Sequence, residues 1–390
     1  MIQRQDELEG LIDRLKGQAW IAIDTEANSL HSYFEKLCLI QISIPGEDYL
    51  VDPLSGIEIA PLLKLLAESN LVLHAMDFDL KMLRRVGDFQ PRKVFDTSIA
   101  GKLLGYRELG LAALLKRHFG LEISKASQKE DWGRRPLPPK MIEYAMTDTR
   151  HLLDLREILR CELLRLGRMS WFEESCHRAV LNASSERERD MESAWRVSGW
   201  MRLSPRGRAV LRALWQWREQ EAMKRDRPSF YVINNEEMVR AAEAFDKGET
   251  FSSRSLRGGA MGAFYTVAQE ALVLPESSWP SPPPRGKGRR VTPEEESQIA
   301  QLKGHRDKIA AELDLDPSVI APRVVLEGLI LNRAETQASM LKWQYDLLEP
   351  ALHDVLNAVH AVEQVELVQA EASSAALADP AAEAATKTGR

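Results

Sequence analysis

The stretch IAIDTEANSL, residues 21–30, decides how the first part of the chain folds. It opens with apolar residues typical of a buried strand, and two carboxylates follow at Asp24 and Glu26. Side chains two residues apart lie on the same face of a strand, so these carboxylates project together. Adjacent carboxylates repel unless protons or cations intervene, and hard divalent cations prefer oxygen ligands. An exposed acidic strand end would look the same, so the stretch indicates a metal site only if partners exist elsewhere.

A first set of partners lies in LHAMDFDLKML, residues 73–83, where a short buried strand gives way to a helix. Asp77 is where a helix N-cap belongs, and we expect its side chain to accept a free backbone N–H. Asp79 falls in the first turn, and we expect it to face the strand ends. Asp79 is therefore the predicted third carboxylate of the site.

A second set lies in EYAMTDTRHLLDL, residues 143–155. Tyr144 and Asp148 are four residues apart in a helical pattern, so they share one face of the helix. An ordinary amphipathic helix could carry the same pair. Four carboxylates and a tyrosine at one point would suit a phosphodiester hydrolase that uses two Mg²⁺ or Mn²⁺ ions. Tyrosine has a reference pKa of about 10, so its predicted role is to position the attacking water rather than to deprotonate it.

The surrounding pattern predicts an α/β domain over residues 1–165, with a mixed sheet flanked by helices. Three consecutive antiparallel strands are expected, followed by a fourth strand after one helix. The expected strands are 19–25, 36–44, 46–52 and 71–75, and the expected helices are 59–68, 78–86, 97–104, 109–118 and 139–160.

Composition indicates a globular protein of the reducing cytoplasm. The chain has 390 residues, of which 44% are hydrophobic and 28% charged. Its three cysteines form no CxxC pair, which argues against a zinc ribbon or a disulfide framework. The N-terminus has no apolar signal core, and no run of 18 apolar residues predicts a membrane span. With no long heptad pattern, a monomer is expected.

Charge is unevenly distributed around a net value of −6. Residues 195–290 contain 17 Lys and Arg against 10 Asp and Glu, whereas the residues from 291 onward contain 8 against 17. A basic segment between acidic ones is typical of a surface that contacts phosphates, although solvated charge would give the same count.

Strand signals fade beyond residue 165, and the remaining chain is predicted to be helical. We expect a connector over 166–200, a helical domain over 201–276, a Pro-rich basic linker over 277–294, a second helical domain over 295–366 and a disordered Ala-rich tail over 367–390. WREQEA before DRPSFYVI (217–233) is echoed by HRDKIA before LDPSVIA (305–321), 88 to 89 residues later. The echo predicts two copies of one module.

Together these motifs resemble a known family. DTEANSL, HAMDFDL and YAMTD occur in the order and spacing of the three motifs of DEDDy 3′→5′ exonucleases. FDTSIAGKLLG (95–105) and KEDWGRRPLPPKMIEYA (129–145) are similar to ribonuclease D, and residues 201–275 resemble its HRDC domain. Residues 295–365 look like a second, more divergent copy.

The resemblance implies a ribonuclease-H-like fold and metal-dependent removal of nucleotides from RNA 3′ ends, with tRNA precursors and other small structured RNAs as substrates and nucleoside 5′-monophosphates as products. It implies that Tyr144 orients the water and that the metal ligands are Asp24, Glu26, Asp79 and Asp148. The role of His74, in the same motif as Asp79, stays open between a buried structural residue and a catalytic one.

The sequence evidence for RNA-contacting residues is weaker than that for the metal ligands. Leu30, His31 and Tyr33 follow the first motif and are candidates for packing on the terminal nucleotide. Candidates for phosphate contact are Arg134, Lys224, Arg225 and Arg227. A DNA exonuclease and a non-catalytic RNA-binding protein remain alternatives, and the complete carboxylate set argues against the second.

Overall fold

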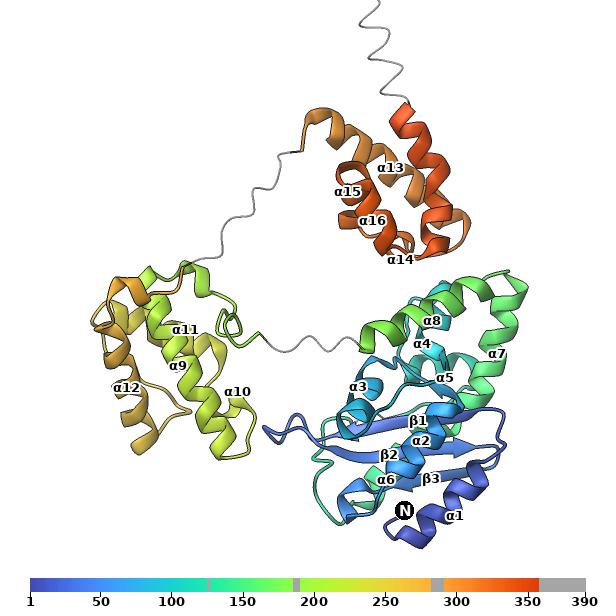
Figure 1. Ribbon diagram of the computed structural model, residues 1–390, viewed down its shortest axis with the longest axis horizontal. Helices are drawn as coiled ribbons and strands as arrows, with labels where there is room; N and C mark the ends of the chain where they lie inside the picture. The colour runs from blue at the N-terminus through green and yellow to red at the C-terminus, as the bar shows by residue number, and fades with distance from the viewer. Residues whose placement is uncertain (125–126, 185–189, 282–290, 358–390) are drawn as a thin grey trace, which may run out of the picture. The chain divides into compact units, whose positions relative to one another are not determined.

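A computed structural model describes residues 1–124, 127–184, 190–281 and 291–357 of the chain. The chain divides into two compact units. The first unit comprises residues 1–100, 108–166 and 176–288, and the second comprises residues 101–107, 167–175 and 289–390. Figure 1 shows the course of the chain and the element labels.

The N-terminal part is built on a five-stranded sheet with the order β3-β2-β1-β4-β5. Antiparallel pairs join β1 to β2 and β2 to β3, and parallel pairs join β1 to β4 and β4 to β5. The strands are β1 (Ile21–Ala27), β2 (Leu37–Ile44), β3 (Glu47–Val51), β4 (Asn70–Leu73) and β5 (Lys93–Asp96). The predicted mixed sheet is therefore confirmed, and the DTE strand lies at its centre.

Local sequence explains the hairpin that begins the sheet. Every residue of β2, LCLIQISI, is buried, which fits a central strand covered on both faces. Pro45 and Gly46 connect β2 to β3, and Gly46 has φ +82°, which glycine adopts without a Cβ clash. The register shifts between Glu26 and Ala27, where β1 ends.

Helices flank this sheet, and two of them position the site. Helix α6 packs against β1, β2 and β3, and α3 packs against β1 and β2. The helices of this part are α1 (Gln5–Leu15), α2 (Ala60–Glu68), α3 (Asp77–Val86), α4 (Thr97–Leu103), α5 (Leu111–Phe119), α6 (Pro139–Arg150), α7 (Leu152–Arg165) and α8 (Met169–Ser184).

The structure differs from the sequence predictions at three points. Strand β5 was not expected, because its four residues are too few to show a period. Residues 139–160 were expected as one helix, but α6 ends at Arg150 and α7 begins at Leu152. The N-terminal segment forms α1, with Leu8, Leu11 and Leu15 buried on one face.

The helical region of the first unit surrounds α9 (Pro205–Lys224). Helices α11 (Asn235–Asp246) and α12 (Gly259–Leu272) pack against α9 and against each other, with the short α10 (Ser229–Val232) between α9 and α11 in the chain. Figure 1 shows α9, α11 and α12 together. Trp215 and Trp217 both lie in their shared core.

The second unit repeats this local structure. It contains α13 (Pro293–Glu312), α14 (Pro317–Ile320), α15 (Arg323–Leu331), α16 (Arg333–Ser339) and a helix over residues 342–357. A long helix is followed in each copy by an aspartate with positive φ and by a one-turn helix: Asp226 (φ +44°) follows α9, and Asp314 (φ +49°) follows α13. The predicted sequence echo is therefore a structural repeat.

A buried arginine marks the same repeat. Arg218 donates from Nη1 to the Ile233 carbonyl, and Arg306 donates from Nη1 to the Ala321 carbonyl, with the same offset of 15 residues.

The predicted tail over 367–390 and the linker residues 282–290 lie outside the described residues. Within the described ranges, no helix has the length and apolar character needed to span a membrane.

Candidate active site

The two carboxylates of the DTE strand project from β1 as the sequence predicts. Ile21 and Ile23 are fully buried, whereas Asp24 and Glu26 are partly exposed. The alternation of strand residues places the two carboxylates on one face of the sheet. In the antiparallel register Asp24 lies opposite Gln41 of β2, and Glu26 lies opposite Leu39.

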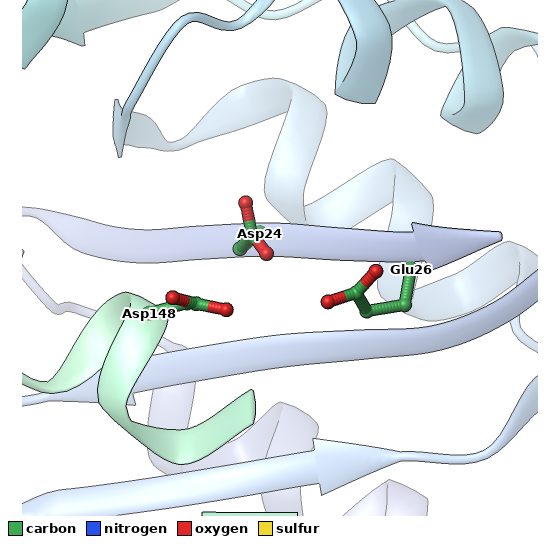
Figure 2. Close-up of side chains that lie close together, drawn as sticks. All are labelled: Asp24, Glu26 and Asp148. Atoms are coloured by element: carbon green, nitrogen blue, oxygen red, sulfur yellow. The ribbon is translucent and has the colours of Figure 1, made fainter. Parts of the chain in front are cut away.

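Helix α6 brings a third carboxylate to this face. Pro139 is its first residue, a position where a missing N–H costs nothing and the fixed φ suits the helix. Oxygen atoms of Asp24, Glu26 and Asp148 lie within 4.8 Å of one another. Figure 2 shows the side chain of Asp148 extending from α6 toward the two carboxylates of β1.

Asp79 faces the same cavity from the first turn of α3. It is only 4% exposed, and its Oδ1 accepts hydrogen bonds from the backbone N–H of Thr25 (2.9 Å) and from Thr25 Oγ1 (2.6 Å). The threonine of the DTE motif therefore holds Asp79, the aspartate of the second motif, in place. The site has three clustered carboxylates with Asp79 beside them.

The predicted role of Asp77 as a helix cap is wrong. Asp77 is exposed and forms an ion pair with Lys81 (2.6 Å). Asp96, at the end of β5, binds the backbone at this strand–helix junction instead. The carboxylate of Asp96 accepts hydrogen bonds from the N–H groups of Ala75 (3.3 Å) and Met76 (2.8 Å). Ala75, in the turn between β4 and α3, has a positive φ of +58°.

Burial and mutual repulsion disfavour the charged forms of all four carboxyl groups. Burial raises the pKa of Glu26 to about 9, and the charges of Asp148 and Asp79 add to the rise. Burial raises the pKa of Asp79 to about 7, although the hydrogen bonds from Thr25 lower it in part. The pKa of Asp148 is also raised by burial to about 7, and that of Asp24 is raised by burial and by its three neighbours. Such a cluster attracts cations.

Tyr144 lies one helical turn before Asp148 on α6, and both side chains line the cavity. Burial and the nearby carboxylates raise the pKa of Tyr144 above its ordinary value. The phenol is therefore protonated at neutral pH, so it can donate and accept hydrogen bonds but cannot serve as a base. The predicted positioning role is consistent with this chemistry.

A cavity of about 500 Å³ opens over these groups. Leu30, a predicted nucleotide contact, lines it, and so does Phe78, for which the sequence predicted no contact. Phe78 is 43% exposed and Leu30 is 42% exposed, so the two together present apolar surface to the cavity. His74 also lines the cavity, and its Nδ1 is 2.9 Å from Thr97 Oγ1.

The other predicted RNA contacts do not line this cavity. His31 donates from Nε2 to the carbonyl of Lys129 (3.0 Å), next to the cavity-lining Gln128 and Glu130. The ring of Tyr33 packs against the hydrophobic core around α9, and its hydroxyl is 3.4 Å from Glu219 Oε2. Arg134 is exposed, on the segment that leads to α6.

The three basic residues at the end of α9 are all exposed. Lys224 and Arg225 share Glu221 as an ion-pair partner, at 3.1 Å and 2.7 Å. Arg227 forms no ion pair with the described residues. Exposed ion pairs of this kind contribute little, so these side chains stay available to an anion.

Two parts of the chain match known protein families. Residues 1–164 match the 3′–5′ exonuclease family, and residues 207–247 match the HRDC domain family. The fold resembles that of a Bifidobacterium adolescentis protein (TM-score 0.76, 22% identity, 92% of this chain and 96% of that chain). It also resembles Escherichia coli RNase D, with a TM-score of 0.67 and 24% identity. That match covers 92% of this chain and 98% of the RNase D chain.

Curated relatives cover most of the chain. Ribonuclease D of Gluconacetobacter diazotrophicus is 30% identical over 343 residues, which is 85% of this chain and 86% of the relative. Ribonuclease D of Zymomonas mobilis is 30% identical over 355 residues, 87% and 89% of the two chains. Because this similarity extends through the exonuclease and HRDC regions together, the chain belongs to the ribonuclease D family and is a 3′→5′ exoribonuclease.

Proposed function

We propose that the chain trims the 3′ ends of tRNA precursors and other small structured RNAs, releasing nucleoside 5′-monophosphates. Two divalent metal ions, Mg²⁺ or Mn²⁺, would be held by Asp24, Glu26, Asp79 and Asp148. The observation that best supports this metal site is that oxygens of Asp24, Glu26 and Asp148 lie within 4.8 Å of one another. A donor set made only of carboxylate oxygens fits a hard divalent cation.

When bound, the ions would activate the attacking water and stabilise charge on the leaving oxygen. The chain's own residues position the reacting groups. Tyr144, one turn before Asp148 on the cavity wall, would hold the water by its hydroxyl. Thr25 keeps the carboxylate of Asp79 at the cavity wall through two hydrogen bonds.

The cavity wall supplies contacts for the terminal nucleotide. Leu30 and Phe78 present apolar surface to the cavity, and bases pack readily on such side chains. Arg134, Lys224, Arg225 and Arg227 are exposed and are the proposed contacts to the RNA backbone farther from the 3′ end. His31 supports the cavity indirectly, because it binds the carbonyl of Lys129.

A labelled-RNA assay tests this function. RNA with a stem and a 3′ extension, labelled at its 5′ end, should shorten stepwise when Mn²⁺ or Mg²⁺ is added and stay intact with chelator. Asp79→Asn should lower kcat by about 100-fold or more, since a catalytic metal site contributes several kcal/mol. Asp77→Asn is the matched control, because Asp77 is on the same helix turn but exposed and paired with Lys81.

Two outcomes would contradict the proposal. Wild-type activity in Asp79→Asn would remove Asp79 from the metal site. Faster shortening of DNA of the same sequence would replace RNA with DNA as the substrate. The monomeric state and the cytoplasmic location stay predictions, and light scattering in solution tests the first.

A further inference from the structure

Gln41 is a buried polar residue beside the acidic cluster that the proposed chemistry does not use. It lies in β2 directly opposite Asp24 and is fully buried. Its Nε2 donates a hydrogen bond to Oδ2 of Asp24 at 3.2 Å. Because opposed residues of an antiparallel pair project from the same face of the sheet, the amide supports this carboxylate from the neighbouring strand.

The other end of the same amide has no partner. Oε1 of Gln41 is buried and accepts no hydrogen bond from the described part of the chain. A buried acceptor without a partner lowers the free energy of unfolding, so an apolar side chain of this length would stabilise β2 better. Stability alone therefore does not explain a glutamine at this position.

The orientation of the amide follows from the charge that it faces. The amide nitrogen is a donor, and the amide oxygen can only accept. The reverse orientation would bring Oε1 against an oxygen of Asp24, and the ionised carboxylate that a bound metal ion requires has no hydrogen to donate to it. The observed orientation satisfies the carboxylate and leaves the unpaired atom on the glutamine.

We infer that Gln41 is a positioning residue for the metal site, which fixes the rotation of the Asp24 carboxyl group so that it meets Glu26 and Asp148. This role rests on the proposed function of the same carboxylates. Partners behind metal ligands commonly contribute in this way, by orienting a ligand that they hydrogen bond. Gln41 itself does not line the cavity, so it acts only through Asp24.

Gln41→Met tests the inference, because methionine keeps the length of the side chain and removes the amide. Calorimetric titration of the full chain with Mn²⁺ should give a Kd raised about tenfold, the lower end of the range for such partners. The kcat should fall while KM for RNA stays unchanged. The Tm without metal should be equal to or above that of the wild type, because the unpaired acceptor is gone.

Ser43→Ala is the matched control. Ser43 is a buried polar residue two positions along the same strand, and its hydroxyl bonds Asp48 (2.7 Å) and Thr149 (2.7 Å). This variant should lower the Tm and leave the Kd for Mn²⁺ unchanged. The opposite pattern in Gln41→Met, with a lower Tm and an unchanged Kd, would overturn the inference.

Gln41→Leu provides a second variant if the methionine variant does not fold. It also removes the donor to Asp24, so Mn²⁺ binding should weaken to a similar extent, and wild-type affinity would also overturn the inference. Failure of the wild type to bind Mn²⁺ would instead refute the proposed metal site. The two failures are therefore distinguishable.

Discussion

Four carboxyl groups that share one cavity make the stability of the metal-free protein depend on pH. Their pKa values lie above the ordinary ones, with Glu26 at about 9 and Asp79 and Asp148 at about 7. The folded protein therefore holds protons that the unfolded chain has already released. Stability is highest below the unfolded pKa values and falls as pH rises through the folded ones.

We therefore predict that protein stripped of metal by a chelator loses thermal stability between about pH 5 and about pH 9. Added Mn²⁺ should raise the Tm more at the alkaline end, because metal binding needs ionised ligands. Thermal scans across this range, with and without Mn²⁺, check both statements. Asp148→Asn should flatten the pH dependence, and a Tm that rises with pH in the stripped wild type would contradict the prediction.

The cavity wall at Phe78 gives a second prediction for a single residue of the site. Its ring is 43% exposed and lines the cavity, and stacking of a base on an aromatic ring is worth about 1–3 kcal/mol. Phe78→Ala should therefore raise KM for a single-stranded RNA 3′ end about tenfold and change kcat less. Steady-state kinetics measures both. Phe230→Ala, which removes an exposed ring outside the cavity, is the control, and an unchanged KM in Phe78→Ala would exclude stacking there.

The residues of the site differ in how well the sequence predicted them. Asp24, Glu26, Tyr144 and Asp148 follow from spacing, because strand and helix periods fix which side chains share a face. Phe78 could not be found in this way, since a cavity wall depends on how α3 meets distant loops. The proposed cap at Asp77 failed because Asp96, which is distant in sequence, supplies the acceptor for the backbone of residues 75 and 76.

Among the elements, the turn after α9 has an unusual set of contacts. Oδ1 of Asp226 accepts hydrogen bonds from Ser32 Oγ (2.6 Å) and from the backbone N–H groups of Tyr33 and Phe34 (both 3.0 Å). These bonds, led by the one from Ser32, hold the pKa of Asp226 below its ordinary value. The loop they bind follows Leu30 of the cavity wall, so the turn supports one side of the site.

Removal of this side chain should loosen the loop. Asp226→Gly keeps the positive φ accessible, because glycine adopts it freely, and deletes the acceptor. Hydrogen exchange at Tyr33 and Phe34 should become about tenfold faster, as expected when local bonds are lost. Asp314→Gly is the control, since Asp314 has the equivalent backbone in the repeat. Equal exchange in Asp226→Gly and the wild type would show that the loop does not depend on this turn.

The elements also show where sequence patterns stop being informative. The echo between residues 217–233 and 305–321 was visible because both copies need a long helix, a turn and a one-turn helix. Strand β5 was not visible, because KVFD shows no alternation of its own; in the described part of the chain it pairs with β4 alone. The break between α6 and α7 at His151 was hidden by a helical pattern that continues across it.

At the scale of the whole molecule, the second unit joins segments that are far apart in the chain. Residues 101–107 and 167–175 group with residues 291–357 among the described residues. Trp171 stacks on Trp343 at 4.9 Å between ring centroids, and the carboxylate of Glu174 accepts from the backbone N–H groups of Lys342 (2.5 Å) and Trp343 (3.3 Å). Sequence patterns did not predict this grouping, because each contact pairs residues more than 160 positions apart.

Gly105 tests whether this grouping contributes to stability. Its φ is +82°, and a Cβ there would lie 2.0 Å from the carbonyl oxygen of Asp314. Gly120 has φ +70° with nothing within 4 Å of its Cβ position, so Gly120→Ala reports backbone strain alone, about 1–2 kcal/mol. Gly105→Ala should lower the Tm further and speed hydrogen exchange at residues 313–315. Equal losses of Tm in the two variants, with no change in that exchange, would mean that the close approach of Gly105 to Asp314 adds nothing to stability.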